Sequence, residues 1–218
     1  MQLKSTNYFF SKRPFLKGFF FISAQALSLP IGSFTVENKK KYKLLLNNFN
    51  VENILIRPPP YENLSEAKLV FNLKKFRTNL IVEQIKRENL DILDFFFEEI
   101  RSEKIDGTLI HSKLSDVLYD VSLVVLDLKL RFKRVRPSVV LSSIDPILDI
   151  PWHSSYPSGH SAQATVVSEL MANLFPSKSQ SFDRLAERIG KNREIAGLHY
   201  PSDTVAGRQL GKYLSKFF

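Results

Sequence analysis

The sequence contains no cysteine, and this absence removes several kinds of chemistry from consideration. Disulfide scaffolds, thiolate nucleophiles and cysteine-based metal sites all need a thiol, whereas the redox compartment stays open. Two common catalytic motifs are also missing, because the chain has neither a Gly-x-Ser-x-Gly elbow nor a glycine-rich Walker loop. The hydrolases that depend on those motifs are therefore disfavoured.

Long hydrophobic runs are absent as well. The longest apolar stretches, Phe19–Ala26 and Val117–Leu128, fall short of the roughly 18 to 20 residues that a membrane-spanning helix needs, and the second contains Asp120 and Asp127. We therefore expect a soluble protein, cytoplasmic or periplasmic, rather than an integral membrane protein. With 218 residues, of which 44% are hydrophobic and 24% charged, the chain is long enough for one globular domain with a sizeable core.

Positive charge gathers at the start of the chain, whose formal net charge is +9. Residues 1–45 hold eight lysine or arginine residues and one acidic residue, Glu37. This basic arm is open to three interpretations: a solvated segment, a peripheral contact with an anionic membrane surface, or an export signal ending near Ala24-Gln25-Ala26. No nucleic-acid-binding motif accompanies the charge, so we expect no nucleic-acid partner.

Apolar residues recur at three- and four-residue intervals from Leu64 onward, and no strand alternation dominates there. The spacing predicts helices at residues 65–75, 78–89, 90–102, 109–134, 158–174, 182–193 and 201–217. Between Pro137 and the fifth of these helices we expect a loop rich in proline and serine. The sequence thus predicts an all-α helical bundle over residues 51–218, preceded by a basic N-terminal arm of uncertain structure over residues 1–50.

Three short segments in the second half of the chain together supply basic residues and two histidines. They are Lys129-Leu130-Arg131-Phe132-Lys133-Arg134-Val135-Arg136-Pro137, Tyr156-Pro157-Ser158-Gly159-His160 and Asn192-Arg193-Glu194-Ile195-Ala196-Gly197-Leu198-His199-Tyr200-Pro201-Ser202-Asp203. Each segment alone is a weak signal. Their occurrence together, in this order, indicates a site for a phosphate-like anion.

Lys129 lies on the apolar face of the predicted helix 109–134, close to Leu118 and Val125. The charged stripe that we expect to face solvent consists of Lys113, Asp116, Asp120, Asp127, Arg131 and Arg134. An ammonium on the apolar face is costly unless an anion lies there. A bound phosphate and an internal salt bridge to a carboxylate both satisfy this requirement.

Arg193 lies on the apolar side of the predicted helix 182–193, so it also indicates a buried anion. Arg136 precedes a proline, which should end the helix and place its guanidinium at a helix terminus. Ser158 and Gly159 lie where a loop becomes a helix, and free backbone N–H groups and the dipole attract anions at such a point.

His199 and Asp203 lie on either side of Pro201, which suits the first position of a helix. Asp203 then falls in the first turn, where its carboxylate can reach back to the imidazole. A second histidine, His153, stands beside Trp152 just before the second segment. Lining the site and packing within the loop are both open interpretations for it.

The three segments resemble, in order and spacing, the signature of the type two phosphatidic acid phosphatase family, which includes bacterial non-specific acid phosphatases and vanadium-dependent haloperoxidases. The resemblance covers roughly residues 58–211, and Asn192 stands where the family usually has serine. It implies a helical bundle with the active site between helix termini. A phosphatase that hydrolyses phosphate monoesters or diphosphates is the implied activity, with a phosphorylated small-molecule or lipid substrate.

The resemblance also implies residue roles. The implied phosphate-binding residues are Lys129, Arg136, Ser158, Gly159 and Arg193. His199, oriented by Asp203, is the implied nucleophile that forms a phosphohistidine, and His160 is the implied proton donor and then base. No metal or other cofactor is implied for a phosphatase.

Two alternatives stay open at this point. A vanadate-dependent haloperoxidase would hold vanadate with the same residues, with His199 as its ligand, because vanadate copies the shape and charge of phosphate in transit. A non-catalytic protein would bind phosphate without turnover. Both histidines and Asp203 favour catalysis, because a binding module needs only the cations. The substrate and the oligomeric state are not indicated.

Overall fold

The computed structural model describes residues 42–44, 49–103 and 105–218. Over these ranges the chain forms helices and no strand, so the predicted all-α fold is confirmed. The α-helices are α1 (Leu64–Asn72), α2 (Asn79–Leu90), α3 (Leu93–Glu99), α4 (Thr108–Phe132), α5 (Pro137–Val140), α6 (Gly159–Leu174), α7 (Ser179–Ile195) and α8 (Pro201–Leu214). Shorter 3-10 turns are η4 (Val51–Asn53), η5 (Leu73–Phe76), η6 (Ser142–Ile144), η7 (Pro176–Lys178) and η8 (Ser215–Phe217). None of the described helices has both the length and the hydropathy that a membrane crossing requires.

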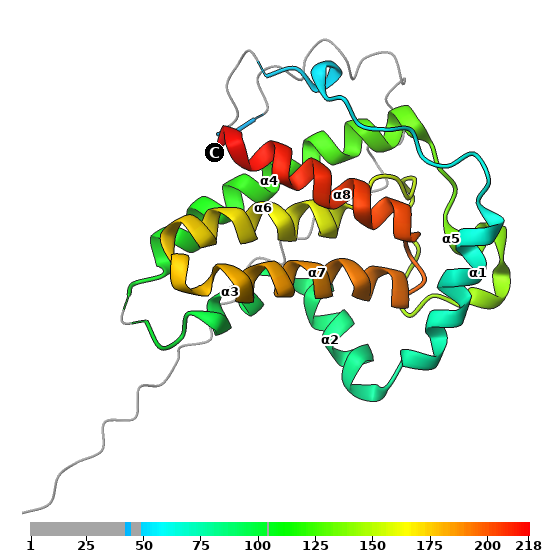
Figure 1. Ribbon diagram of the computed structural model, residues 1–218, viewed down its shortest axis with the longest axis horizontal. Helices are drawn as coiled ribbons and strands as arrows, with labels where there is room; N and C mark the ends of the chain where they lie inside the picture. Colours follow the sequence, from blue (N-terminus) through cyan, green and yellow to red (C-terminus); the bar gives the residue numbers. More distant parts are fainter. Residues whose placement is uncertain (1–41, 45–48, 104) are drawn as a thin grey trace, which may run out of the picture. The chain divides into compact units, whose positions relative to one another are not determined.

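The helix α6 is central to the bundle (Figure 1). It packs against α7 and α8, and also contacts α4 and α3. Its buried apolar residues are Ala162, Ala164, Val166, Val167 and Met171. Burial of apolar surface contributes roughly 25 cal/mol per Å², so these contacts supply much of the stability of the core. The same packing brings the start of α6 and the start of α8 together, since the Ser158 N–H donates to the Asp203 carbonyl at 3.0 Å.

Glycine permits the close approach of α8 to α6. A Cβ added at Gly207 would lie 2.5 Å from the Ser158 carbonyl oxygen and 2.8 Å from the Ser161 Cβ. One turn later, a Cβ at Gly211 would lie 2.6 Å from the Ala162 carbonyl oxygen. The two helices could not keep their separation with larger residues at these positions.

Replacing Gly207 by alanine should therefore destabilise the fold. Overpacking typically costs about 1–3 kcal/mol, which exceeds the roughly 0.5–1 kcal/mol that alanine gains over glycine inside a helix. We expect a lower urea midpoint at unchanged m value in chemical denaturation. Gln209→Ala, at an exposed position of the same helix, is the control. An unchanged midpoint for Gly207→Ala, or an equal loss in the control, would contradict the tight contact.

Each predicted helix is present, although the predicted helix 90–102 is observed only as α3, Leu93–Glu99. A second difference lies around Pro137. The helix α4 ends at Phe132, two residues before the predicted end, and Lys133 follows in a left-handed conformation with φ of 51°. The predicted loop after Pro137 contains the one-turn helix α5, in which Pro137 occupies the first position. Proline fixes φ near the helical value, so it favours a helix start even within a loop.

The predicted solvent-facing stripe of α4 is wrong at two residues. Asp120 is fully buried, and its carboxylate accepts the backbone N–H groups of Lys43 and Leu44 at 2.8 and 2.7 Å. Arg134 is also buried, because it lies beyond the end of α4 and turns toward carboxylates of other segments. Most of the predicted arm lies outside the described residues, and the division of the chain at residue 51 stays a prediction.

Candidate active site

Lys129 lies at the end of α4 and is buried, with 3% of its surface exposed, as its position on the apolar face predicted. Its Nζ donates to the carbonyl oxygens of Ser154 and Ser155, each at 2.9 Å. An ammonium has three hydrogens, so one donor is left over. Within the described part of the chain no carboxylate forms an ion pair with Lys129, and the salt-bridge interpretation of its placement is not supported.

Burial lowers the pKa of the Lys129 ammonium well below its ordinary value, the nearby Arg136 charge adds to this, and Asp203 opposes it. A site that penalises cations in this way gains when an anion enters, because an opposite charge favours the ammonium form. The electrostatics of the site therefore favour a negatively charged ligand.

Arg136 and Asp203 fix the state of the His199 ring from its two sides. The Nε2 atom of His199 lies 3.2 Å from Arg136 Nη1, and its Nδ1 lies 3.2 Å from Asp203 Oδ2. An arginine can only donate, so Nε2 is the acceptor there and carries a lone pair. Nδ1 then carries the hydrogen and donates it to the carboxylate. His199 is thus a neutral imidazole with Nε2 unprotonated and Nδ1 bonded to Asp203.

Arg136 is itself held by the loops that precede α6 and α8. Its Nη1 donates to the Leu198 carbonyl at 2.8 Å, and its Nη2 lies 3.1 Å from His153 Nδ1. Burial lowers the pKa of Arg136 to about 10, and Asp203 opposes this. His153 therefore contributes to the site through Arg136, in addition to packing within its loop beside Trp152.

The start of α6 supplies a second group of donors. Ser158 is the N-cap residue, yet its hydroxyl makes no capping bond, and its buried Oγ has no hydrogen-bond partner among the described residues. The sequence suggested that the backbone N–H of Ser158 would be free to bind an anion. In the structure this N–H donates to the Asp203 carbonyl instead. The N–H group of Gly159, the first residue of α6, has no partner within the helix.

Arg193 is fully buried near the end of α7, as predicted, and its guanidinium forms an ion pair with a carboxylate of the protein. Its Nη2 donates to Glu88 Oε2 at 3.2 Å and to the Ile85 carbonyl at 2.9 Å. Asn192 donates to both oxygens of Glu88, at 2.9 and 3.0 Å. The Nε of Arg193 is buried without a hydrogen-bond partner in the described part of the chain. Glu88, itself fixed by Asn192, and the Ile85 carbonyl thus hold Nη2 of the guanidinium, and Nε is left for another acceptor.

Sequence reasoning missed Glu88, although a signal was present. Ile81, Ile85 and Glu88 share one face of α2 at helical spacing, and Glu88 is completely buried. The argument that singled out Lys129 and Arg193 on apolar faces applies equally to this carboxylate.

His160 and His199 both lie in a field of positive charge. Burial, followed by the charges of Arg193, His199, Lys129 and Arg136, lowers the pKa of His160 well below its ordinary value. Burial and the same three cations also lower the pKa of His199. We call Lys129, Arg136 and Arg193 the cation cluster. The positive charges of this cluster act on both histidines and disfavour their protonated forms. Hydrogen bonds link Arg136 to His199, His199 to Asp203 and Asp203 to Ser158, which Gly159 and His160 follow in the chain. The charges of Lys129 and Arg193 act on both histidines.

The sequence model of the PAP2 superfamily matches residues 114–218, a stretch that contains all three motifs. The predicted PAP2 resemblance is confirmed. A non-specific acid phosphatase of Salmonella typhimurium is 37% identical over 59 residues, which cover 27% of this chain and 24% of that protein. A lipid A 1-phosphatase of Rhizobium johnstonii is 39% identical over 61 residues, covering 28% of this chain and 25% of that protein. The chain thus matches about a quarter of the length of these PAP2-like relatives.

Two solved structures share the helical fold of this chain. A bacterial vanadium-dependent iodoperoxidase superposes with a TM-score of 0.63 at 19% identity, over 77% of this chain and 53% of that one. LpxE of Aquifex aeolicus superposes with a TM-score of 0.51 at 22% identity, over 74% of this chain and 97% of that one. At these identities the likeness establishes the fold alone.

Proposed function

We propose that this protein is a phosphatase that hydrolyses phosphate monoesters or diphosphates through a phosphohistidine intermediate. The observation that carries the proposal is the state of His199, whose Nε2 lone pair faces the donor Arg136 while its Nδ1–H is bonded to buried Asp203. This is the arrangement that a nucleophile requires when it attacks a group bound by the cation cluster. The names of the acid phosphatase and lipid A phosphatase relatives support the same reaction class.

The bound phosphoryl group would be held by donors that the protein does not fully use. These are the third hydrogen of Lys129, Arg193 Nε, the Ser158 hydroxyl and the Gly159 N–H at the start of α6. Arg136 would exchange its bond to His199 Nε2 for a bond to the ligand. Phosphoryl transfer depends mainly on positioning and on stabilisation of charge. Cations that converge in a buried site meet that requirement, because their interactions are much stronger there than in water.

In the first step, Nε2 of His199 attacks phosphorus, a P–N bond forms and the bond to the leaving oxygen breaks. His160, in its protonated form, gives its proton to that oxygen. The phosphorylated ring becomes cationic, since Nδ1 keeps its hydrogen, and the Asp203 carboxylate stabilises that charge at 3.2 Å. In the second step, His160 takes a proton from water, the water oxygen attacks phosphorus and the P–N bond breaks. Phosphate leaves and both rings return to their starting forms.

The pH dependence should differ between free protein and complex. His160 must be protonated to act, and its lowered pKa in the free protein means that this form is lost at a lower pH than usual. A bound phosphoryl anion raises that pKa again. The alkaline limb of kcat, which reports the complex, should therefore lie at higher pH than the alkaline limb of kcat/KM.

The acid limb of that profile should lie below the ordinary histidine range, because burial and the cations keep His199 neutral to lower pH. Rates measured from about pH 4 to 9 give both limbs. His160→Asn is the control, since it should remove the alkaline limb but leave the ionisation of the substrate. Coincident alkaline limbs for kcat and kcat/KM would contradict the mechanism.

The test of the proposed function is a substrate panel with purified protein. It should contain an aryl phosphate, a lipid phosphate, an isoprenyl diphosphate, a nucleotide and a sugar phosphate. Parallel assays with vanadate, peroxide and bromide or iodide test for haloperoxidase activity. Phosphate release from at least one ester supports the proposal. Halide oxidation without phosphate release, or phosphate binding without any turnover, would overturn it.

A further inference from the structure

We propose that Arg134 is the positioning residue of the His199–Asp203 pair, holding the Asp203 carboxylate in the orientation and charge state that the nucleophile needs. The proposal rests on the proposed phosphatase function, because it assigns the role within that reaction. Arg134 acts through Asp203, since each of its three nitrogens donates to a residue of the protein.

The Arg134 guanidinium is buried and held on every edge. Nη1 donates to Asp203 Oδ1 at 2.6 Å and to Ser202 Oγ at 2.7 Å. Nη2 donates to Glu66 Oε2 at 2.7 Å, and Nε donates to Asn63 Oδ1 at 2.8 Å. Its face is covered too, because Cζ lies 3.9 Å from the centroid of the Tyr200 ring. These contacts fix the orientation of the guanidinium, whereas an arginine on the surface can move between several orientations.

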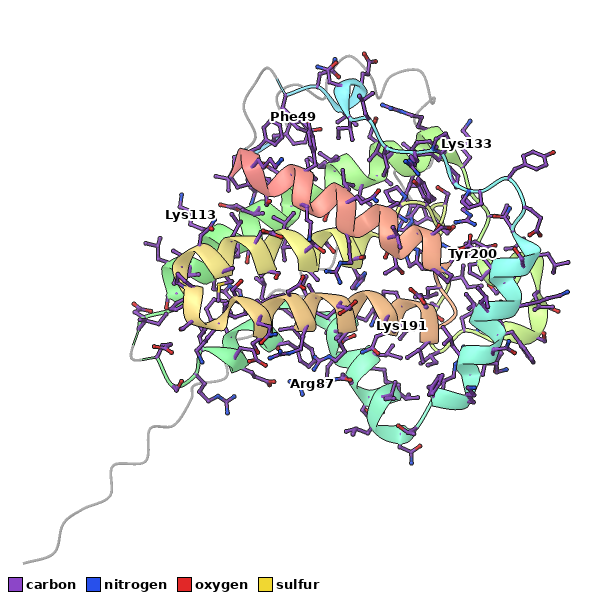
Figure 2. All side chains as sticks on the ribbon, viewed as in Figure 1. Phe49, Arg87, Lys113, Lys133, Lys191 and Tyr200 are labelled. Atoms are coloured by element: carbon purple, nitrogen blue, oxygen red, sulfur yellow. The ribbon has the colours of Figure 1, made fainter. Side chains whose placement is uncertain are left out.

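Figure 2 marks the two places in the chain that this contact joins. Lys133, next to Arg134, lies at the end of α4, and Tyr200 lies at the start of α8. The contact thus ties the first of the three motifs to the third. It places the arginine behind the catalytic pair, on the opposite side of Asp203 from His199.

The two oxygens of Asp203 have separate tasks. Oδ1 receives Arg134, whereas Oδ2 accepts Nδ1 of His199 at 3.2 Å and the N–H of Tyr200 at 3.0 Å. Burial raises the pKa of Asp203, and Arg134 is the largest influence that opposes this, followed further down by Lys129. Without Arg134 the carboxyl would gain a proton more readily. It would then no longer fix the Nδ1–H form of His199 or stabilise a cationic phosphohistidine.

Glu66 is a second anion on Arg134 and comes from α1. Its Oε1 accepts the Ser202 N–H at 2.9 Å, and its Oε2 accepts the Ser202 hydroxyl at 2.7 Å. One guanidinium thus serves two carboxylates, buried Asp203 and half-buried Glu66, so a change at Arg134 alone leaves both without their cation. A buried ion pair that loses one partner is strongly destabilising. The test therefore removes Arg134 together with Glu66.

The decisive comparison is between Glu66→Gln/Arg134→Gln and Glu66→Gln alone, in which the Arg134–Asp203 pair remains. We expect the double variant to have a kcat lower by roughly 10- to 100-fold than Glu66→Gln, as for other groups that orient a catalytic residue. KM should change little, because the cation cluster is intact. The acid limb of the pH profile should move to higher pH, since Asp203 is protonated sooner. Arg134→Lys, which keeps the charge but not the planar fork, should recover part of the loss.

A structural readout separates this proposal from the proposed function. Nitrogen NMR of the His199 ring reports which nitrogen carries the hydrogen, and it requires no activity. If the unmodified protein hydrolyses no phosphate, the proposed function fails, yet loss of the Nδ1–H form in the double variant still supports the positioning role. Arg131→Gln removes an exposed arginine on α4 and should change neither readout.

A folded double variant with the kcat, pH profile and ring state of Glu66→Gln would overturn the proposal. Folding is checked by thermal denaturation and by binding of inorganic phosphate. If the double variant does not fold, Arg134→Lys decides instead. An unchanged kcat and acid limb in that variant would then overturn the positioning role.

Discussion

His199→Ala should lower kcat by at least about 10⁴-fold, as loss of a nucleophile does in other covalent mechanisms. The change removes the nitrogen that we propose forms the P–N bond, while Lys129, Arg136 and Arg193 stay in place. Binding of inorganic phosphate should therefore persist, and titration calorimetry measures it. Release of phosphate from an aryl ester measures the activity.

The intermediate gives this first prediction a second readout. Rapid quenching of the unmodified protein should yield a phosphoenzyme that is stable in base and labile in acid, as expected for a phosphoramidate. His199→Ala should give none. His111→Ala, at a histidine near the start of α4, is the matched control and should retain full activity. A folded His199→Ala protein that keeps turnover would remove His199 from the nucleophile role.

His160→Ala should lower kcat by roughly 10²- to 10⁴-fold for an alkyl phosphate, the range typical of general acid–base catalysis. The reason is that a poor leaving group departs only when it receives a proton. A dinitrophenyl phosphate leaves without one, so the first step with that substrate should be nearly unaffected. The second step still lacks its base, because His160 also activates water. The phosphoenzyme should then accumulate.

Stopped-flow measurement of dinitrophenol release tests this second prediction. His160→Ala should give a burst that approaches one equivalent of product per protein, followed by slow turnover. The unmodified protein, measured alongside, should show a smaller burst. Equal losses for the alkyl and the dinitrophenyl ester, with no burst, would rule out His160 as the general acid.

The helices and the burial of Lys129 and Arg193 could be predicted from the sequence. A helix repeats every 3.6 residues, so a charged residue among apolar neighbours at that spacing must be buried. Lys129 and Arg193 are buried for this reason. Pro201 likewise marks the start of α8 and places Asp203 in its first turn.

The partners of the buried cations could not be predicted from the sequence, because they depend on which segments meet in three dimensions. Glu88 and Arg193 are 105 positions apart in the chain, and Arg134 and Glu66 are 68 apart. Spacing along one helix gives no information about such pairs. Arg134 also lies beyond the end of α4, where the helical repeat that assigned it to solvent no longer applies.

The hydrogen bond between Arg136 and Nε2 of His199 has a consequence for substrate choice. Until a ligand binds that guanidinium, the lone pair that we propose attacks phosphorus is hydrogen-bonded to the donor next to it. A negatively charged ester competes for the same hydrogens and exposes the nitrogen as it binds, so capture and activation become a single event. An uncharged ester of equal size would compete more weakly for Arg136, because its oxygens form weaker hydrogen bonds than an anion does, and Nε2 would stay bonded to the guanidinium.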